Sequence, residues 1–101
     1  MPQRHPVTAL ASLPPGSSQA FTIAGRHIAF FNVAGRIHAI DDTCPHAGAP
    51  LSQGRLEGCV VTCPWHAIRF DVTTGRRPGQ SDDTLTSYPV FINGDQIEVE
   101  V

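Results

Sequence analysis

The alternation of apolar and polar residues is clearest at the end of the chain. Ile97, Val99 and Val101 alternate with glutamine and glutamate residues, and this period of two predicts a strand with one buried face. The preceding apolar run, 89–92, is separated from it by an Asn-Gly-Asp turn signal. The pattern therefore predicts a hairpin formed by 89–92 and 96–101.

Three further runs, 21–23, 27–33 and 36–40, are rich in β-branched and aromatic residues and predict strands. A tight turn at Ala34 and Gly35 joins the last two in a second hairpin. Turn signals containing glycine and proline recur along the chain, and no long stretch has a helical period. The sequence therefore predicts an all-β fold, an antiparallel sandwich or a small barrel.

The middle of the chain, residues 41–79, differs from the rest because it is loop-rich and holds all three cysteines. A Cys-x-His motif at Cys44 and His46 precedes a Cys-x-x-His motif at Cys63 and His66. Two such pairs at short spacing predict a metal site, and three cysteines beside histidines favour a metal over disulfides. A structural Cys2His2 zinc site uses the same residue types and stays open as an alternative.

The two motifs and their surroundings resemble the Rieske ferredoxin family, from about Phe21 to the C-terminus. The similarity is carried by the segments Cys44 to Leu51, Leu56-Glu57-Gly58, Cys63 to His66, Phe70-Asp71, Thr74-Gly75 and Tyr88-Pro89-Val90. By this resemblance Cys44 and Cys63 hold one iron of a [2Fe-2S] cluster through thiolates, and His46 and His66 hold the other iron. The implied fold is a β-sandwich with a small, loop-rich cluster-binding subdomain at about 41–79, within one domain spanning 1–101.

Residues absent from the cluster loops set an expectation for the reduction potential. High-potential Rieske proteins of cytochrome bc complexes carry a disulfide pair and hydroxyl donors near the cluster. Here Ala49 and Trp65 stand in place of the cysteines, and Ile68 and Phe70 stand in place of the serine and tyrosine. With fewer donors toward the sulfurs, we expect the lower part of the range of about −150 to +300 mV found for such centres. Ala67 also departs from the glycine usual after the second histidine.

Composition and length exclude several classes of function. The net charge is −2, and the seven arginines form no basic stripe, which argues against nucleic-acid binding. No apolar segment approaches the length of a membrane helix, so we expect a soluble, cytoplasmic protein. A chain of 101 residues leaves no room for an oxygen-activating domain beside a cluster domain, so it should not be an enzyme itself.

These expectations lead to a one-electron carrier, a Rieske ferredoxin. It takes electrons from a flavin-dependent ferredoxin reductase and passes them to a terminal ring-hydroxylating oxygenase, through transient contacts near Pro45, His46, Trp65 and His66. One alternative is the small Rieske subunit of a nitrite reductase. An alternative from another class is a zinc-stabilised binding module.

Several nearby residues have simpler interpretations. Cys59 precedes Val60 in a predicted strand and is interpreted as a small buried core residue. His27 and His38 lie in predicted strands and His5 in the N-terminal arm, so we expect no ligand role for them. Trp65 is expected to pack beside the cluster. Two interpretations of the apolar rim remain open, loop packing and a docking surface, and its members are Pro45, Ala47, Ala49, Pro50 and Trp65.

Overall fold

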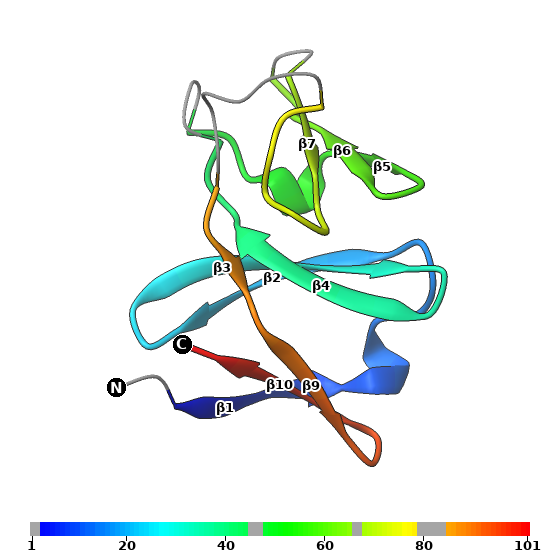
Figure 1. The fold of residues 1–101 in the computed structure, drawn as a ribbon, viewed down its shortest axis with the longest axis vertical. Coiled ribbons are helices and arrows are strands. Elements are labelled where there is room, and N and C mark those ends of the chain that lie inside the picture. Colours follow the sequence, from blue (N-terminus) through cyan, green and yellow to red (C-terminus); the bar gives the residue numbers. More distant parts are fainter. Residues whose placement is uncertain (1–2, 45–47, 66–67, 79–84) are drawn as a thin grey trace.

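The fold was analysed in a computed structural model, which describes residues 3–44, 48–65, 68–78 and 85–101. Ten short strands and two 3-10 turns make up its regular structure (Figure 1). In chain order they are β1 (Arg4–Ala9), η1 (Leu10–Ser12), β2 (Ser18–Ile23), β3 (Arg26–Val33), β4 (Arg36–Asp41), η2 (Leu51–Gln53), β5 (Arg55–Glu57), β6 (Val60–Thr62), β7 (Arg69–Asp71), β8 (Ser87–Tyr88), β9 (Val90–Asn93) and β10 (Gln96–Glu100). The described part of the chain contains no α-helix, and the predicted all-β class is confirmed.

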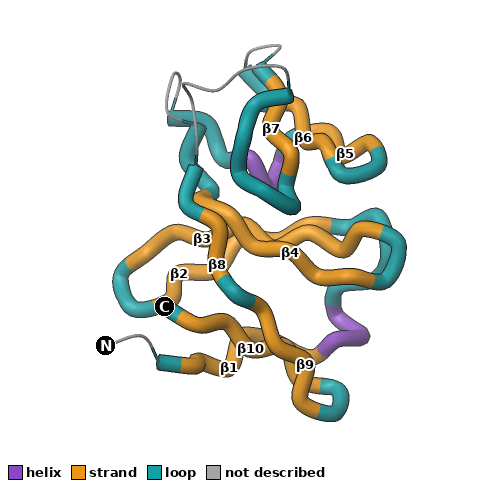
Figure 2. Tube along the Cα trace, in the orientation of Figure 1, coloured by secondary structure: helices purple, strands orange, loops and turns teal. Residues whose placement is uncertain are grey.

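The strands form three antiparallel sheets. Their orders are β1-β10-β9, β2-β3-β4-β8 and β5-β6-β7. The first two sheets form the sandwich, and the small third sheet covers the other face of the second one (Figures 1 and 2). The central sheet is therefore buried on both faces.

Burial on both faces explains the sequence of β3. Ile28 and Phe30 point into the core between the two sandwich sheets, whereas Ala29 and Phe31 point into the core beneath the third sheet. All four residues are fully buried. A strand covered on both faces needs a continuous apolar run, and 28–31 supplies one.

Both predicted hairpins are confirmed. β3 and β4 pair through Phe30 and Ala39, and their turn holds Ala34 and Gly35 at positive φ angles of 52° and 94°, as a tight two-residue hairpin turn requires. β9 and β10 form the second hairpin, and Asn93 belongs to its first strand instead of the turn. Ile97 and Val99 are fully buried, as their alternation predicted.

Three short strands were not foreseen from the sequence. β1 contains Pro6, which lacks a backbone N–H, and the β1–β10 register shifts between Pro6 and Thr8. β5 and β7 have only three residues each, and their outer positions are polar. Such short segments give too little alternation to be distinguished from loops.

Candidate metal centre

The two predicted ligand cysteines lie in two loops of matching construction. Cys44 donates its backbone N–H to the carbonyl of Ala49 at 2.9 Å, and Cys63 donates its N–H to the carbonyl of Ile68 at 2.8 Å. Each bond closes a loop from a cysteine to the fifth residue after it. The first loop has a further bond, from the Gly48 N–H to the Cys44 carbonyl at 2.8 Å.

Both cysteines are buried, with 1% of Cys44 and 3% of Cys63 exposed. They belong to one hydrophobic core, which also contains Leu51, Val61 and Phe70. Neither cysteine forms a disulfide. Buried, free thiols fit the thiolate ligands of a metal cluster, because ligation replaces the water that burial removes.

His46 and His66, the other two predicted ligands, lie outside the described residues, as do Pro45 and Ala47. Where the chain is described, no group of three or more His, Cys, Asp or Glu side chains is placed to hold a metal ion. The described residues thus supply two cysteines of the expected ligand set. The two histidines remain predicted ligands.

Asp42 anchors the first loop to the central sheet, and it was missed from the sequence. This residue is 8% exposed, and its carboxylate accepts a hydrogen bond from the Ser52 N–H at 2.8 Å. Its backbone N–H donates to the carbonyl of His27 at 3.0 Å, and its carbonyl accepts from the Leu51 N–H at 2.6 Å. Asp42 thereby fixes both sides of the loop that contains Cys44.

The second loop is anchored by the third sheet. Thr62, immediately before the loop, pairs with Arg69, immediately after it. The next pair along the two strands is formed by the buried residues Val61 and Phe70. Phe70 is fully buried and Ile68 is half-buried. These two apolar residues bring no hydroxyl donor to the core around the cysteines.

A second unforeseen network holds the strand that leaves the subdomain. The Tyr88 hydroxyl donates to an Asp41 carboxylate oxygen at 2.6 Å and accepts from the Arg26 guanidinium at 3.3 Å. The other oxygen of Asp41 accepts from the Thr86 N–H at 3.2 Å. Burial raises the pKa of Tyr88 above its ordinary value, and the hydrogen bond to Asp41 raises it further. The tyrosine therefore stays protonated and serves as a structural donor.

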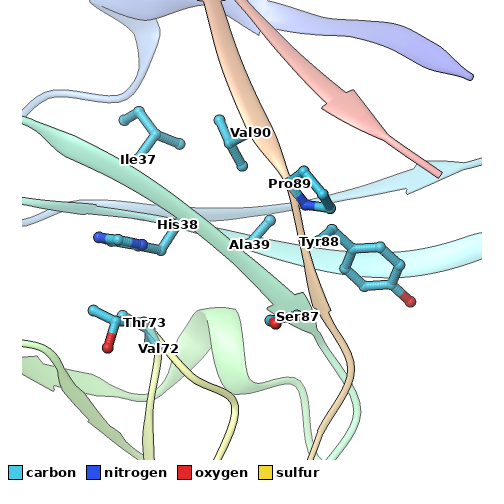
Figure 3. A pocket seen from close by; sticks show the side chains of 9 residues that line it. All are labelled: Ile37, His38, Ala39, Val72, Thr73, Ser87, Tyr88, Pro89 and Val90. Carbon is cyan, nitrogen blue, oxygen red and sulfur yellow. The ribbon is translucent and has the colours of Figure 1, made fainter.

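A cavity of about 400 Å³ lies beside this network, between β4 and the turn that follows β7 (Figure 3). His38, Thr73 and Ser87 line it together with apolar residues, and none of its lining residues belongs to the two cysteine loops. Burial lowers the pKa of His38 from its ordinary value, and the nearby positive charge of Arg36 lowers it further, while Asp71 acts in the opposite direction.

The structure corrects the interpretation of one residue near the loops. Cys59 is not a buried strand residue: it lies half-buried in the turn between β5 and β6, and its thiol is 3.8 Å from a carboxylate oxygen of Asp71. Glycine at position 58 has a positive φ of 61°, which ends the strand before Cys59. Trp65 is 65% exposed, so most of its side chain faces solvent, and its packing beside the cluster stays a prediction.

The apolar rim is only partly present as predicted. Ala49 is fully buried in the core and Pro50 is half-buried, so neither offers much apolar surface. Trp65 is the large exposed apolar side chain of the described part of the rim. His27 is exposed, and its ring Nδ1 lies 3.1 Å from the Thr22 hydroxyl.

Comparison with known proteins identifies the family. Residues 3–89 match the Rieske [2Fe-2S] domain. The ferredoxin component of the naphthalene 1,2-dioxygenase system of Pseudomonas aeruginosa is 37% identical over 94 residues, which cover 92% of this chain and 90% of that protein.

Solved structures agree with the sequence match. A chain in the complex of reduced oxygenase and oxidised ferredoxin in carbazole 1,9a-dioxygenase superposes with a TM-score of 0.85 at 31% identity, covering 95% of this chain and 91% of that one. A Mycobacterium tuberculosis protein assigned as an NADH-dependent nitrite reductase small subunit superposes with a TM-score of 0.91 over 100% of this chain and 96% of that one, but its 22% identity shows the fold alone. This chain belongs to the Rieske [2Fe-2S] domain family.

Proposed function

We propose that this chain is a one-electron carrier whose [2Fe-2S] cluster is held by Cys44, His46, Cys63 and His66, within one Rieske domain spanning 1–101. The observation that carries the proposal is the pair of matching loops, each closed by a backbone hydrogen bond around a buried, free cysteine. When bound, the cluster supplies reversible one-electron oxidation and reduction.

The residues of this chain hold and shield that group. Cys44 and Cys63 supply thiolates from the interior, and the apolar core that includes Leu51 and Phe70 excludes water from them. Asp42 and the β6–β7 pairing keep the two loops in place.

The proposed partners are a flavin-dependent ferredoxin reductase and a terminal oxygenase of the ring-hydroxylating kind. Relatives of this chain are the ferredoxin components of dioxygenase systems, electron carriers and not enzymes. A ferredoxin chain of the same fold has been solved in complex with its oxygenase. The exposed Trp65 supports transient docking at the second cysteine loop, near Pro45, His46 and His66.

The two alternatives to a dioxygenase ferredoxin have less support. A zinc-stabilised module does not account for membership of a [2Fe-2S] family. The nitrite reductase subunit is supported by similarity of fold only. The dioxygenase ferredoxins combine the fold with higher sequence identity over nearly the whole chain.

We further propose a low reduction potential and a cytoplasmic location. The apolar Ile68 and the buried Phe70 support the first proposal, because hydroxyl donors near the cluster raise the potential. Three cysteines free of disulfides support the second. In the described residues, no helix has the length and hydrophobicity needed to span a membrane.

Reconstitution tests the carrier function. NADH, a flavin-dependent ferredoxin reductase, this chain and a terminal oxygenase are combined, and oxidised product is measured with the chain present or omitted. We expect turnover only when the chain is present, and none from the chain alone. If the reductase never reduces the intact cluster, the proposed function is wrong.

A further inference from the structure

Asp42 is buried more deeply than its anchoring role requires. It is 8% exposed, whereas every other aspartate, glutamate and arginine that the structure describes is half-buried or exposed. Removing a carboxylate from water costs free energy, and an uncharged asparagine would offer the Ser52 N–H an acceptor oxygen of the same kind. The bond to Ser52 therefore does not explain why a charge is buried at this position.

The side chains of Asp42 and Cys44 lie on the same side of the chain. Thr43, between them, forms an antiparallel bridge with Pro50, so the segment is extended. Asp42 and Cys44 are buried and Thr43 is exposed, as expected where side chains alternate along an extended chain. Both inner side chains thus point into the interior, from Cα atoms that two extended residues place about 7 Å apart.

No described cation offsets the charge of Asp42. Its carboxylate accepts the bond from the Ser52 N–H, and no arginine or histidine of the described residues forms an ion pair with it. The neighbouring Asp41 differs, because its half-buried carboxylate shares the Tyr88 hydroxyl with Arg26. Asp42 therefore brings a negative charge without a described counter-charge into the interior beside Cys44.

A charge in this position acts on the proposed ligand loop through protein and not through water. Asp42 and Cys44 are both buried, and charges interact more strongly in the interior than at the surface, because the effective dielectric constant is lower there. Mobile ions also screen buried charges less than exposed ones. The Asp42 carboxylate therefore opposes any further negative charge that arrives at this loop.

We propose that the buried charge of Asp42 lowers the reduction potential of the cluster. One-electron reduction adds a negative charge, which the Asp42 carboxylate disfavours. The inference rests on the proposed function, and it adds a cause of low potential that is independent of the apolar Ile68 and Phe70. A lower potential makes the reduced carrier a stronger electron donor to its acceptor.

The test is voltammetry of the cluster-loaded wild-type chain and four variants. Asp42→Asn and Asp42→Ser remove the charge and keep an oxygen acceptor, whereas Asp42→Glu keeps the charge and disturbs the packing. Glu57→Gln removes a charge of the same sign from a side chain of the third sheet that is 68% exposed, and it serves as the control. Unchanged visible and electron paramagnetic resonance spectra show that each variant keeps its cluster ligands.

We expect each neutral Asp42 variant to raise the equilibrium constant for one-electron reduction about tenfold, which corresponds to a potential about 59 mV higher. Asp42→Glu and Glu57→Gln should each change this constant less than about twofold, because the first keeps the buried charge and the second removes an exposed one. The rise should persist at about 0.5 M salt, since the charge is buried.

The inference is overturned if a neutral variant that keeps its cluster shows no rise, or if Asp42→Glu or Glu57→Gln shows an equal rise. Loss of the cluster from both neutral variants would also overturn it, because Asp42 would then serve only the structure of the loop. The proposed function fails by a different result: the reductase never reduces the intact wild-type cluster, whatever the potentials of the variants.

Discussion

The backbone N–H of Cys63 donates to the carbonyl of Ile68 at 2.8 Å, which repeats the bond between Cys44 and Ala49 in the other loop. The two loops, which are separated in the sequence by β5 and β6, thus hold their buried cysteines with the same backbone hydrogen bond. The repetition suits a binuclear group, which needs ligands from two sides. It also makes the two cysteines equivalent in mutational tests.

Replacing either buried cysteine should remove the cluster, whereas replacing the third should not. Cys44→Ser and Cys63→Ser each remove a proposed thiolate ligand, so we expect loss of most of the iron. Cys59→Ser keeps a donor toward Asp71 in the β5–β6 turn and should leave iron content unchanged. Iron analysis of the three purified variants checks this. Cluster loss in Cys59→Ser with retention in Cys44→Ser would contradict the assignment.

Asp42→Ala should destabilise the first loop. The change leaves the partly buried Ser52 N–H without its acceptor, and since a fully buried unsatisfied donor costs about 1–3 kcal/mol, the loss should lie toward the lower end of that range. Asp42→Asn retains an acceptor oxygen and should cost less. Thermal unfolding, followed by circular dichroism at one scan rate, compares the two variants. Equal thermal midpoints for Asp42→Ala and the wild type would show that the anchor does not contribute.

Gly75→Ala should destabilise the chain more than the same change at Gly35. Both glycines have a positive φ, 78° and 94°, and a left-handed alanine costs about 1–2 kcal/mol at either position. At Gly75 the new Cβ would also lie 2.2 Å from the Leu85 carbonyl oxygen, whereas at Gly35 nothing lies within 4 Å. The total at Gly75 should therefore reach about 3 kcal/mol or more. Similar unfolding midpoints for the two variants would rule out the close contact.

His38 should make stability depend on pH below neutrality. Its folded-state pKa lies below the ordinary value because of burial and Arg36. The unfolded chain therefore binds more protons at this site as pH falls through that window, and stability decreases. His38→Gln removes this term, so between about pH 7 and pH 5 the variant should lose less stability than the wild type. Urea unfolding across that range measures the difference, and parallel curves would contradict the expected sign and cause.

Much of the fold was predictable because long strands have clear patterns. The continuous apolar run of β3 and the alternation in β10 follow from burial on two faces and on one face. The three-residue strands β5 and β7 were not predicted, since such short strands form through pairing with neighbouring strands more than through local sequence preference. β1 was obscured by Pro6.

The proposed ligands of the candidate site were predictable from their spacing in the sequence, but the residues that anchor the ligand loops were not. Cysteine and histidine pairs at such short spacing are typical of metal sites, so the proposed ligands stood out. Asp42 did not, because an acidic residue beside a loop is usually solvated and only the structure shows its burial. Cys59 was placed wrongly because the sequence does not reveal where the β5–β6 turn ends. The 65% exposure of Trp65 was not predictable, because it depends on the three-dimensional path of the loop.

The most direct test of the account is the content of the purified, cluster-loaded chain. We expect two irons and two acid-labile sulfides per chain, and an electron paramagnetic resonance signal only after one-electron reduction, because the oxidised [2Fe-2S] state is spin-silent. Voltammetry on the same sample should place its potential in the lower part of the range of about −150 to +300 mV. One zinc per chain with no sulfide, and no signal after reduction, would contradict the central claim.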